Sequence, residues 1–397
     1  MKVSVLVALV CTLTFSLPGF AAEDWLIEYG PKRLMNDPRY AGVCLKADLP
    51  KDLSYLSSKP EPRPPYKKSE TGGSADPRYL LFTPNLGDPP QDKERAEMIN
   101  LNSVVLSDYG VLAFLPKLRE AWIVTDKPEQ LPQALLDALG TDRSLKCLCI
   151  RGDVSSLDLA VLGRVPGLET IYFSDSHLTA RNIEQLAAIK SLHCIEVSDE
   201  HELSAASVAS LVAIKRLRDL RLSCPLAADA DLSLLKDLSQ LRRLHIPVRA
   251  NTLEQVSKLI KLKVLKAGGG ASDTSIEAGI PHLSTLKNLI SLELLEGSYV
   301  HITGETLGDL RYLPLKYLVV NSCHITPDGY RSLSDIKSLR GLDITWTRPP
   351  HTGLMAVSNL RNLRRLDASC IDDYDQLKVL ADTLPQCSIQ ASKNCNR

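Results

Sequence analysis

The sequence predicts an α/β solenoid of about 11–12 short repeats, and three observations support this fold class. A hexapeptide with leucine at its first position and apolar residues at its fourth and sixth positions recurs ten times. Successive copies start 21 to 27 residues apart. Leucine and isoleucine at intervals of three precede several copies, as in Leu186-Ile189-Leu192. One such unit cannot bury its own apolar face, but stacked neighbours can.

The ten hexapeptides are the expected strands of the solenoid. Their fourth and sixth residues alternate with neighbours at the third and fifth positions, which is the period-two pattern of a half-buried strand. The copies are LKCLCI (145–150), LETIYF (168–173), LHCIEV (192–197), LRDLRL (217–222), LRRLHI (241–246), LKVLKA (262–267), LISLEL (289–294), LKYLVV (315–320), LRGLDI (339–344) and LRRLDA (363–368). We interpret LNSVVL (101–106) and LREAWI (118–123) as degenerate earlier copies.

The chain between the strands is expected to return through a helix or a tight helical turn. Several units carry a hydroxyl residue where that helix should begin, and such residues are favoured N-caps. The expected caps are Thr179, Ser204, Thr303, Thr326 and Thr352. Pro327 follows Thr326 and occupies the first helical position, where proline is favoured.

These units give the chain a family resemblance. Over residues 101–391 the array resembles leucine-rich repeat proteins. The unit LKYLVVNSCHITPDGYRSL (315–333) is similar to their cysteine-containing subtype, with Cys323 at the ninth position. The resemblance implies a right-handed solenoid with a parallel sheet on the concave side and helices on the convex side.

The N-terminus has the order of a secretory signal peptide, assigned to residues 1–22. Lys2 precedes the apolar run VSVLVALVCTLTFSL, and the small residues Ala21 and Ala22 follow. The run is short for a membrane anchor, and no later stretch approaches the roughly 18 apolar residues of a span. We therefore expect a secreted or periplasmic protein without a stable membrane anchor.

The remaining organisation follows from composition. We expect an N-terminal segment at 23–56, a Pro- and Gly-rich linker at 57–78, a cap at 79–100, the repeat domain at 101–391 and a polar tail at 392–397.

Ten cysteines are present, and nine remain once Cys11 leaves with the signal peptide. An odd number cannot all pair within one monomer. Cys387 and Cys395 are candidates for a disulfide that closes the C-terminal end, with an unpaired cysteine as the alternative. Cys147 and Cys149, two residues apart on one strand, are about 6.5–7 Å apart and poorly placed to pair. We interpret them as thiols on the concave face in preference to a metal or redox site.

Arg151-Gly152-Asp153 has the sequence of an adhesion motif. Adhesion requires its display on a mobile loop tip, whereas here Arg151 ends a strand and Asp153 is the ninth residue of its unit. The register therefore predicts a turn, and adhesion is retained only as an alternative.

No other motif supports a catalytic or metal site. Asp199-Glu200-His201-Glu202 follows a strand without a second histidine at a useful sequence spacing, so a solvated turn is expected. Gly268-Gly269-Gly270 lacks the ending of a phosphate loop. We therefore expect no catalytic residue, no metal and no cofactor.

The third and fifth positions define the expected concave face. Its candidate partner-binding residues are Glu196, Asp219, Arg221, Arg243, His245, Lys266, Glu293, Tyr317, Asp343, Arg365 and Asp367. They are either solvated positions or a mixed-charge surface that docks a protein, with Asp219 to Lys266 at its centre.

Charge and aromatic content restrict the partner. The chain has 47 Lys and Arg against 47 Asp and Glu, so no bulk field favours nucleic acid. Aromatic residues make up only 5%, which argues against base stacking. The sequence thus predicts an exported, non-catalytic protein-binding scaffold. A surface adhesin and an enzyme with a concave-face thiol are the alternatives.

Overall fold

The computed structural model describes residues 79–82, 98–102, 118–124, 131–248, 251–268, 276–295, 302–347, 353–369, 371 and 374–391. All of them belong to the unit formed by residues 68–397. The signal peptide, the N-terminal segment, the linker and the C-terminal tail lie outside the described residues, so their assignments stay predictions.

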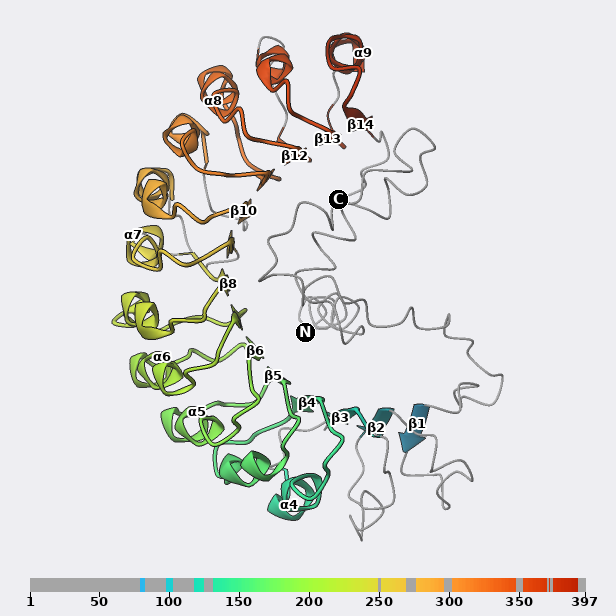
Figure 1. Cartoon of the computed structure of the whole chain (residues 1–397), viewed down its shortest axis with the longest axis vertical. Coiled ribbons are helices and arrows are strands. Elements are labelled where there is room, and N and C mark those ends of the chain that lie inside the picture. Colours follow the sequence, from blue (N-terminus) through green and yellow to red (C-terminus); the bar gives the residue numbers. More distant parts are fainter. Residues whose placement is uncertain are drawn as a thin grey trace, which may run out of the picture. The chain divides into compact units, whose positions relative to one another are not determined.

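The described strands form one fourteen-stranded sheet in chain order, and every neighbouring pair is parallel (Figure 1). The strands are β1 (Tyr79–Phe82), β2 (Met98–Asn102), β3 (Glu120–Val124), β4 (Cys147–Arg151), β5 (Thr170–Ser174), β6 (Cys194–Ser198), β7 (Asp219–Leu222), β8 (Arg243–Ile246), β9 (Val264–Gly268), β10 (Ser291–Leu295), β11 (Tyr317–Val319), β12 (Gly341–Asp343), β13 (Arg365–Asp367) and β14 (Ser388–Gln390).

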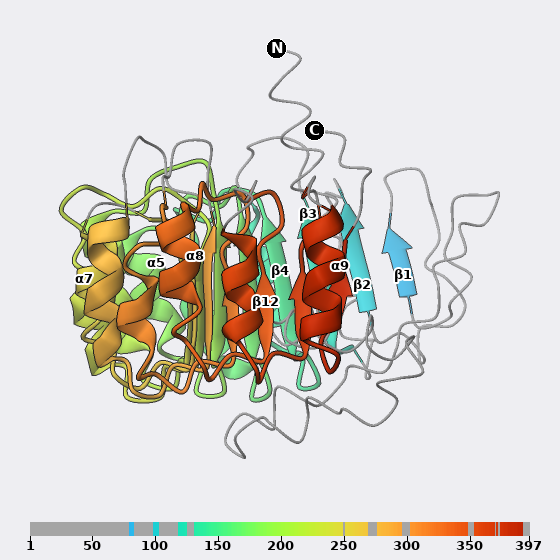
Figure 2. The same cartoon turned by 90° about the horizontal axis from the view of Figure 1, so that it is seen from above.

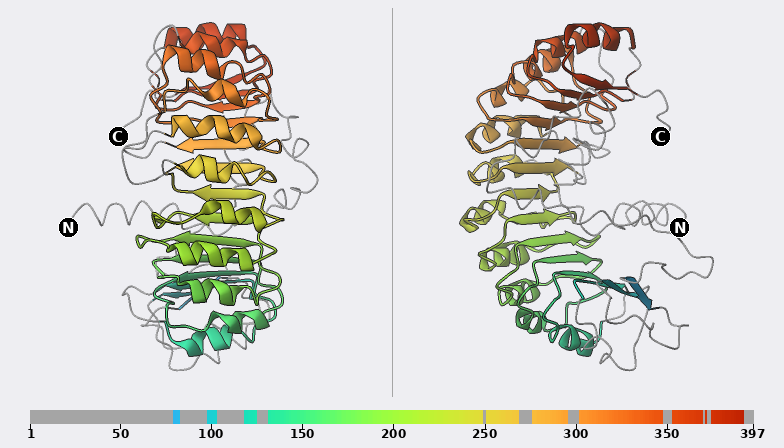
Figure 3. Two further views of the ribbon diagram at one scale, coloured as in Figure 1. Left: turned by 90° about the vertical axis from the view of Figure 1, so that its left-hand side faces the viewer. Right: turned by 45° about the vertical axis from the view of Figure 1, so that its right-hand side comes forward.

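Helices return the chain between most of these strands and lie as a second layer on one side of the sheet (Figures 1, 2 and 3). The α-helices are α4 (Gln133–Leu139), α5 (Ala180–Leu186), α6 (Ala205–Ser210), α7 (Thr252–Val256), α8 (Pro327–Leu333) and α9 (Tyr374–Thr383). The 3₁₀ helices are η6 (Leu159–Arg164), η7 (Leu211–Ala213), η8 (Leu232–Asp237), η9 (Glu277–Thr285), η10 (Leu307–Leu310) and η11 (Leu354–Asn359).

The predicted register is observed in the repeats. On β4, Leu148 and Ile150 are buried and alternate with half-buried neighbours. The leucine at the first position, such as Leu145, is fully buried beneath the helices. Burying one such side chain stabilises the fold by about 1.5–3 kcal/mol, and each unit buries several. The core is therefore a continuous column of leucine side chains between sheet and helices.

Adjacent repeats are joined by the same backbone contacts at each strand start. The carbonyl of Lys146, at the second position, accepts the N–H groups of both Glu169 and Thr170 in the next unit, at 2.9 and 3.1 Å. The carbonyl of Arg218 accepts from Arg242 and Arg243 in the same way. This shared acceptor keeps equivalent residues of successive units side by side.

The eighth position also has a recurring conformation. Asp175, Ser322 and Trp346 occupy it with φ of 49°, 58° and 63°, in the left-handed region. His177, at the tenth position with φ of 47°, is the other non-glycine residue with positive φ in the described part of the chain. Its conformation is thus not part of the repeat pattern.

Three of the expected N-caps are confirmed. Thr179, Ser204 and Thr326 each accept a hydrogen bond from the backbone N–H three residues ahead. Thr303 is wrong as a cap, because η10 begins after Thr306. Thr352 lies outside the described residues.

Glu277 instead binds the backbone that Thr303 was expected to cap. Its carboxylate accepts the N–H groups of Thr303, Gly304 and Thr306 from the following repeat. This charged acceptor satisfies more donors than one hydroxyl could, which explains why the helix starts later than expected.

The sheet extends into the segment that is expected to cap the repeat domain. Residues 79–82 and 98–102 were assigned mainly to a cap, but they form β1 and β2 of the same sheet. The earlier copy predicted at 101–106 is also out of register, because Met98 pairs with Glu120 on β3. The strand therefore falls in AEMINL (96–101). This hexapeptide begins with alanine, so it does not match a pattern that requires leucine at the first position. The sheet consequently has more strands than the 11–12 repeats expected.

Candidate functional site

Two in-register rows of side chains cover the sheet face opposite the helices, which we call the ladder face. The first ladder comprises the third positions: Glu120, Cys147, Thr170, Cys194, Asp219, Arg243, Val264, Ser291, Tyr317, Gly341, Arg365 and Ser388. The second ladder comprises the fifth positions: Trp122, Cys149, Tyr172, Glu196, Arg221, His245, Lys266, Glu293, Val319, Asp343, Asp367 and Gln390.

All eleven predicted partner-binding residues lie in these two ladders. The geometry thus brings them onto one face, as expected, although their binding of a partner stays a prediction. They are not equally accessible, however. Asp219, Arg221, Arg243, Glu293 and Asp367 are buried, each at most 7% exposed.

An ionic network joins the middle of the ladder face. Arg221 donates to both carboxylate oxygens of Asp219, at 3.3 and 2.9 Å, and to Glu196 at 3.1 Å. Arg243 donates to the same Asp219 carboxylate at 2.8 Å. One aspartate on β7 therefore connects two arginines from neighbouring repeats.

The charge states of this network follow from burial and pairing. Burial alone would raise the pKa of Asp219, but the charges and hydrogen bonds of Arg221 and Arg243 outweigh it and lower that pKa. Burial dominates at Glu196, whose pKa is raised even though Arg221 opposes the shift. Asp219 is thus the firmly ionised anchor of the two arginines.

The central region also contains unsatisfied donors of Arg243 and one neutral histidine. Within the described residues, Nε and Nη2 of Arg243 have no hydrogen-bond partner, and buried unsatisfied donors are costly. Burial, followed by the positive charges of Lys266 and Arg221, lowers the pKa of His245 to about 3. His245 is therefore a neutral side chain at physiological pH.

The C-terminal half of the ladder face carries separate, smaller contacts. Lys266 pairs with Glu293 at 2.8 Å, and its side chain is 34% exposed. Asp343 and Asp367 lie opposite each other on β12 and β13. Burial raises the pKa of Asp343, hydrogen bonds from Thr345 oppose this, and the charge of Asp367 adds to it.

The cysteines lie where the register placed them. Cys147 and Cys149 are half-buried on β4, and Cys194 is two strands away on β6. Cys194 is a buried free thiol whose pKa burial and Asp219 raise, so it is not activated as a nucleophile. Cys387 is buried, and Cys395 lies outside the described residues, so their disulfide stays a prediction.

The Arg-Gly-Asp tripeptide is tied into the sheet edge. Arg151 Nε contacts Asp175 at 3.0 Å, and Gly152 is buried. The Asp153 side chain is 18% exposed and accepts the N–H of Ser155 at 2.8 Å. These contacts agree with the predicted turn and leave the motif poorly placed for display.

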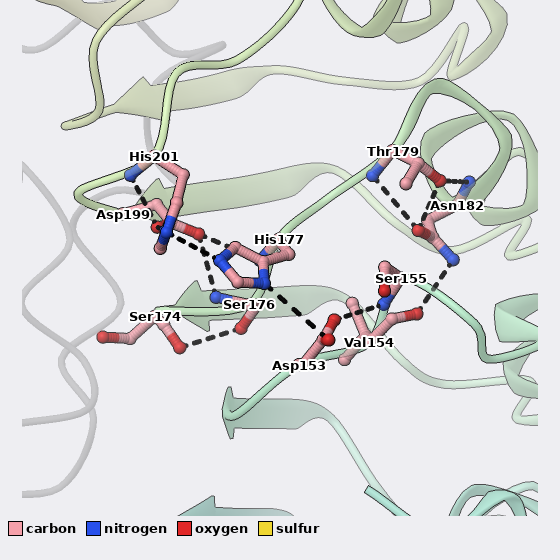
Figure 4. A network of polar contacts seen from close by, with 10 residues as sticks. All are labelled: Asp153, Val154, Ser155, Ser174, Ser176, His177, Thr179, Asn182, Asp199 and His201. Carbon is pink, nitrogen blue, oxygen red and sulfur yellow. Dashed lines mark hydrogen bonds and ion pairs between the residues drawn. The ribbon is translucent and has the colours of Figure 1, made fainter. Parts of the chain in front are cut away.

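Four side chains meet at the carboxyl end of β4, β5 and β6, and we call Asp153, His177, Asp199 and His201 the edge cluster (Figure 4). The Nε2 atoms of His177 and His201 are 2.9 Å apart. His201 Nδ1 lies 2.7 Å from Asp199 Oδ1, and His177 Nδ1 lies 3.7 Å from Asp153 Oδ2. In each histidine, Nδ1 thus faces a carboxylate and Nε2 faces the imidazole of the second histidine.

The backbone holds this arrangement in place. Asp199 Oδ2 accepts the N–H groups of Ser176 and His177 from the preceding repeat, at 2.9 and 3.0 Å. Burial tends to raise the pKa of Asp199, but hydrogen bonds from His201, His177 and Ser176 lower it overall. The same carboxylate therefore orients one histidine ring and fixes the loop that carries the other.

The sequence interpretation missed this cluster because it sought a second histidine close in sequence. His177 and His201 both occupy the tenth position of consecutive units, 24 residues apart. The repeat period itself was the available signal, since it places equivalent residues side by side.

Among the described residues, no group of three or more His, Cys, Asp or Glu side chains could hold a metal ion. In the same part of the chain, no helix combines the length and apolar character needed to cross a membrane.

Comparisons with solved structures place this geometry in a known class. An internalin (inlF) from Listeria monocytogenes has a TM-score of 0.46 and 18% identity, covering 77% of this chain and 89% of its own. A leucine-rich repeat protein from Leptospira interrogans has a TM-score of 0.35 and 15% identity, over 77% and 93%. A TLR13–ssRNA13 complex has a TM-score of 0.50 and 16% identity, over 77% of this chain and 47% of that one.

The in-register parallel sheet and the likeness at a TM-score of 0.50 identify the fold as that of leucine-rich repeat proteins. The chain has the leucine-rich repeat fold that its hexapeptides indicated. No family model matches the sequence, and no curated protein is significantly similar to it.

Proposed function

We propose that the chain is an exported, non-catalytic scaffold that binds a protein partner on its ladder face. The observation that carries the proposal is the pair of in-register ladders, which present polar and charged side chains away from the helices over many strands. A repeat array offers such a face as one extended surface, and complementary charges give it specificity.

The accessible part of this surface lies beside the ionic network, not within it. Lys266 is the most accessible charge among the paired ladder residues. Arg221 and Arg243 serve instead to hold Asp219 and Glu196 in place. Partner contact is therefore expected at Lys266, which the buried carboxylate of Glu293 orients, with the network as rigid support.

A charge swap tests this proposal without removing an ion pair. The Lys266→Glu, Glu293→Lys double variant keeps an opposite-charge pair at the two positions that are 2.8 Å apart in the present chain, and it reverses the sign of the more exposed charge. We expect it to retain the melting temperature of the wild type and to recover less of a specific partner in affinity capture from extracellular or envelope material. Replacement of the buried Arg221 or Arg243 by an acidic residue would be a poorer test, because it would also break the ion pairs of the network and destabilise the fold.

The matched control is a swap on the helical side. Asp375 and Lys378 pair on α9 with exposed side chains, so Asp375→Lys, Lys378→Asp makes the same chemical change away from the ladders. Equal recovery of the same proteins by wild type and both swaps would rule out the Lys266 region as the binding site.

Export is a separate part of the proposal and rests on the N-terminal sequence, with Lys2 before an apolar run and Ala21-Ala22 after it. We expect the intact mass of the exported protein to correspond to a start near Ala22 or Glu23. Recovery only of unprocessed chain inside cells would contradict export.

A further inference from the structure

Two histidines from consecutive repeats bring their Nε2 atoms together at the sheet edge. The separation of 2.9 Å is set by the 24-residue period and by the left-handed backbone of His177. That conformation turns the ring toward His201 and is not required by the repeat pattern. The two rings meet edge to face, with planes at 82° and centroids 3.8 Å apart.

The carboxylates determine which nitrogen of each ring carries the proton. A carboxylate oxygen accepts hydrogen bonds, so His201 Nδ1, 2.7 Å from Asp199 Oδ1, is the protonated nitrogen. Asp153 Oδ2 favours the same tautomer of His177 across 3.7 Å. With that tautomer in both rings, the two Nε2 lone pairs are available to a ligand; with the proton of His177 on Nε2, the two atoms form a hydrogen bond.

A cation bound by both Nε2 lone pairs would take the place of the proton in that hydrogen bond. The hydrogen bond is bent, because a straight N–H···N bond would place the ring centroids farther apart than 3.8 Å. The side chains of His177 and His201 are 37% and 62% exposed, so an ion and its water ligands can reach them.

The geometry points to a divalent transition-metal site in which His177 and His201 supply two imidazole ligands and water supplies the others. At the usual metal–nitrogen distance of about 2.0–2.1 Å, nitrogens 2.9 Å apart subtend roughly 90° at a shared ion. That angle suits neighbouring positions of a tetragonal ion such as Cu²⁺ or Ni²⁺. Imidazole donors also disfavour Ca²⁺ and Mg²⁺, which prefer oxygen.

Asp199 and Asp153 fit the second shell of such a site. Histidines that bind metals almost always donate their other ring N–H to a carboxylate, a carbonyl or water, which fixes the tautomer and raises ligand basicity. Asp199 does this at 2.7 Å while it also anchors the loop of His177. The edge cluster thus has oriented ligands even though it provides only two.

The test is titration of the purified full chain with Cu²⁺ and Ni²⁺ by calorimetry, with Mg²⁺ as the comparison ion. Loss of either imidazole should weaken Cu²⁺ binding by about 100-fold or more, because the second ligand acts at a high effective concentration. His177→Asn keeps a residue that tolerates the left-handed backbone, and His201→Gln keeps a polar side chain of similar reach. Asp153→Asn should weaken binding by about 10-fold.

The matched control is His282→Ala, which removes an exposed histidine on η9 and should leave the affinity unchanged. Electron paramagnetic resonance of the Cu²⁺-loaded chain should show two imidazole nitrogens, and one in either histidine variant. Unchanged melting temperatures of the metal-free variants in chelator would exclude misfolding as the cause. Wild-type affinity in His177→Asn, or a signal from a single nitrogen in the wild type, would overturn the site.

Discussion

At the scale of single residues, burial determines which ladder charges stabilise the fold and which oppose it. Asp219 is ionised and held by two arginines, whereas Asp343 faces Asp367 and has a raised pKa. A raised carboxyl pKa means that the ionised form is less favourable in the folded chain than in the unfolded one. At neutral pH, ionised Asp343 therefore lowers the free energy of unfolding.

Asp343→Asn should accordingly stabilise the protein at pH 7, by about 0.5–2 kcal/mol, the range of comparable charge corrections. The amide oxygen can still accept the N–H of Thr345, which Asp343 Oδ1 binds at 2.9 Å. The gain should disappear as the pH falls below about 4, where Asp343 itself becomes protonated. Urea unfolding of the variant and the wild type at pH 7 and below about pH 4 measures the difference in their free energies of unfolding. Asp367→Asn should stabilise less, because it relieves the same repulsion but weakens a carboxylate that accepts from Ser369 and Thr345.

His245 gives the opposite pH dependence. Its pKa is lowered to about 3, so between about pH 6.5 and 3 the unfolded chain binds a proton that the folded chain does not. Stability should therefore fall as the pH decreases through this range. His245→Gln should reduce that slope by up to about 1.4 kcal/mol per pH unit, the effect of one proton. Identical slopes in urea unfolding series of the two proteins would contradict the assignment.

At the scale of elements, a close contact between a helix and the loop that precedes the previous helical segment fixes the spacing of two repeats. Helix α8 begins at Pro327, and a Cβ atom added to its third residue, Gly329, would lie 2.0 Å from the carbonyl oxygen of Thr303. That oxygen already accepts the N–H of Thr326 at 3.0 Å. The contact is between backbones, so neither side can move without shifting a whole unit.

Gly329→Ala should therefore destabilise the protein by about 1–3 kcal/mol, the usual cost of overpacking. Gly167→Ala is the matched control, because its nearest neighbour is the flexible Lys146 Nζ at 3.1 Å. We expect the control to change the free energy of unfolding by no more than about 0.5 kcal/mol. Equal effects of the two substitutions on the urea midpoint would show that the contact is not restrictive.

Much of the element pattern could be predicted from sequence, for physical reasons that also explain the failures. Leu145, Leu148 and Ile150 reveal β4 because the strand buries alternate side chains against the helices. The strand at 98–102 lacks the leading leucine, so the hexapeptide search shifted its start to residue 101. Ladder membership follows from the period alone, but the burial of Asp219 and Arg243 depends on packing that the period does not encode.

At the scale of the described unit, contacts run mainly between consecutive repeats. Each interior strand, such as β7, pairs with one neighbour on either side, whereas β14 pairs with β13 in the described sheet. Stability is then close to a sum of unit terms and nearest-neighbour terms. The effect of a core substitution should depend on its place along the sheet.

Leu220→Ala, on β7, should cost about 2–5 kcal/mol, because Leu220 is fully buried between two neighbouring repeats. Ile389→Ala, on β14, should cost less, since its side chain is only partly buried. Hydrogen exchange should show lost protection across β6 to β8 in the first variant and only near β13 and β14 in the second. Loss of protection at β7 in the Ile389 variant would indicate a single cooperative unit.

The shared carbonyl acceptor at each strand start has a consequence for how the chain can change its length. Because Lys146, Glu169 and His193 present the same acceptor to the next unit, removal of residues 168–191 would join two compatible surfaces. The shortened chain would lose one step and keep its alignment elsewhere, with Cys147 now adjacent to Cys194. It would also lose His177 and thus one of the two imidazoles of the edge cluster. Whole-repeat duplication or loss can therefore create or delete a two-residue site in a single genetic event.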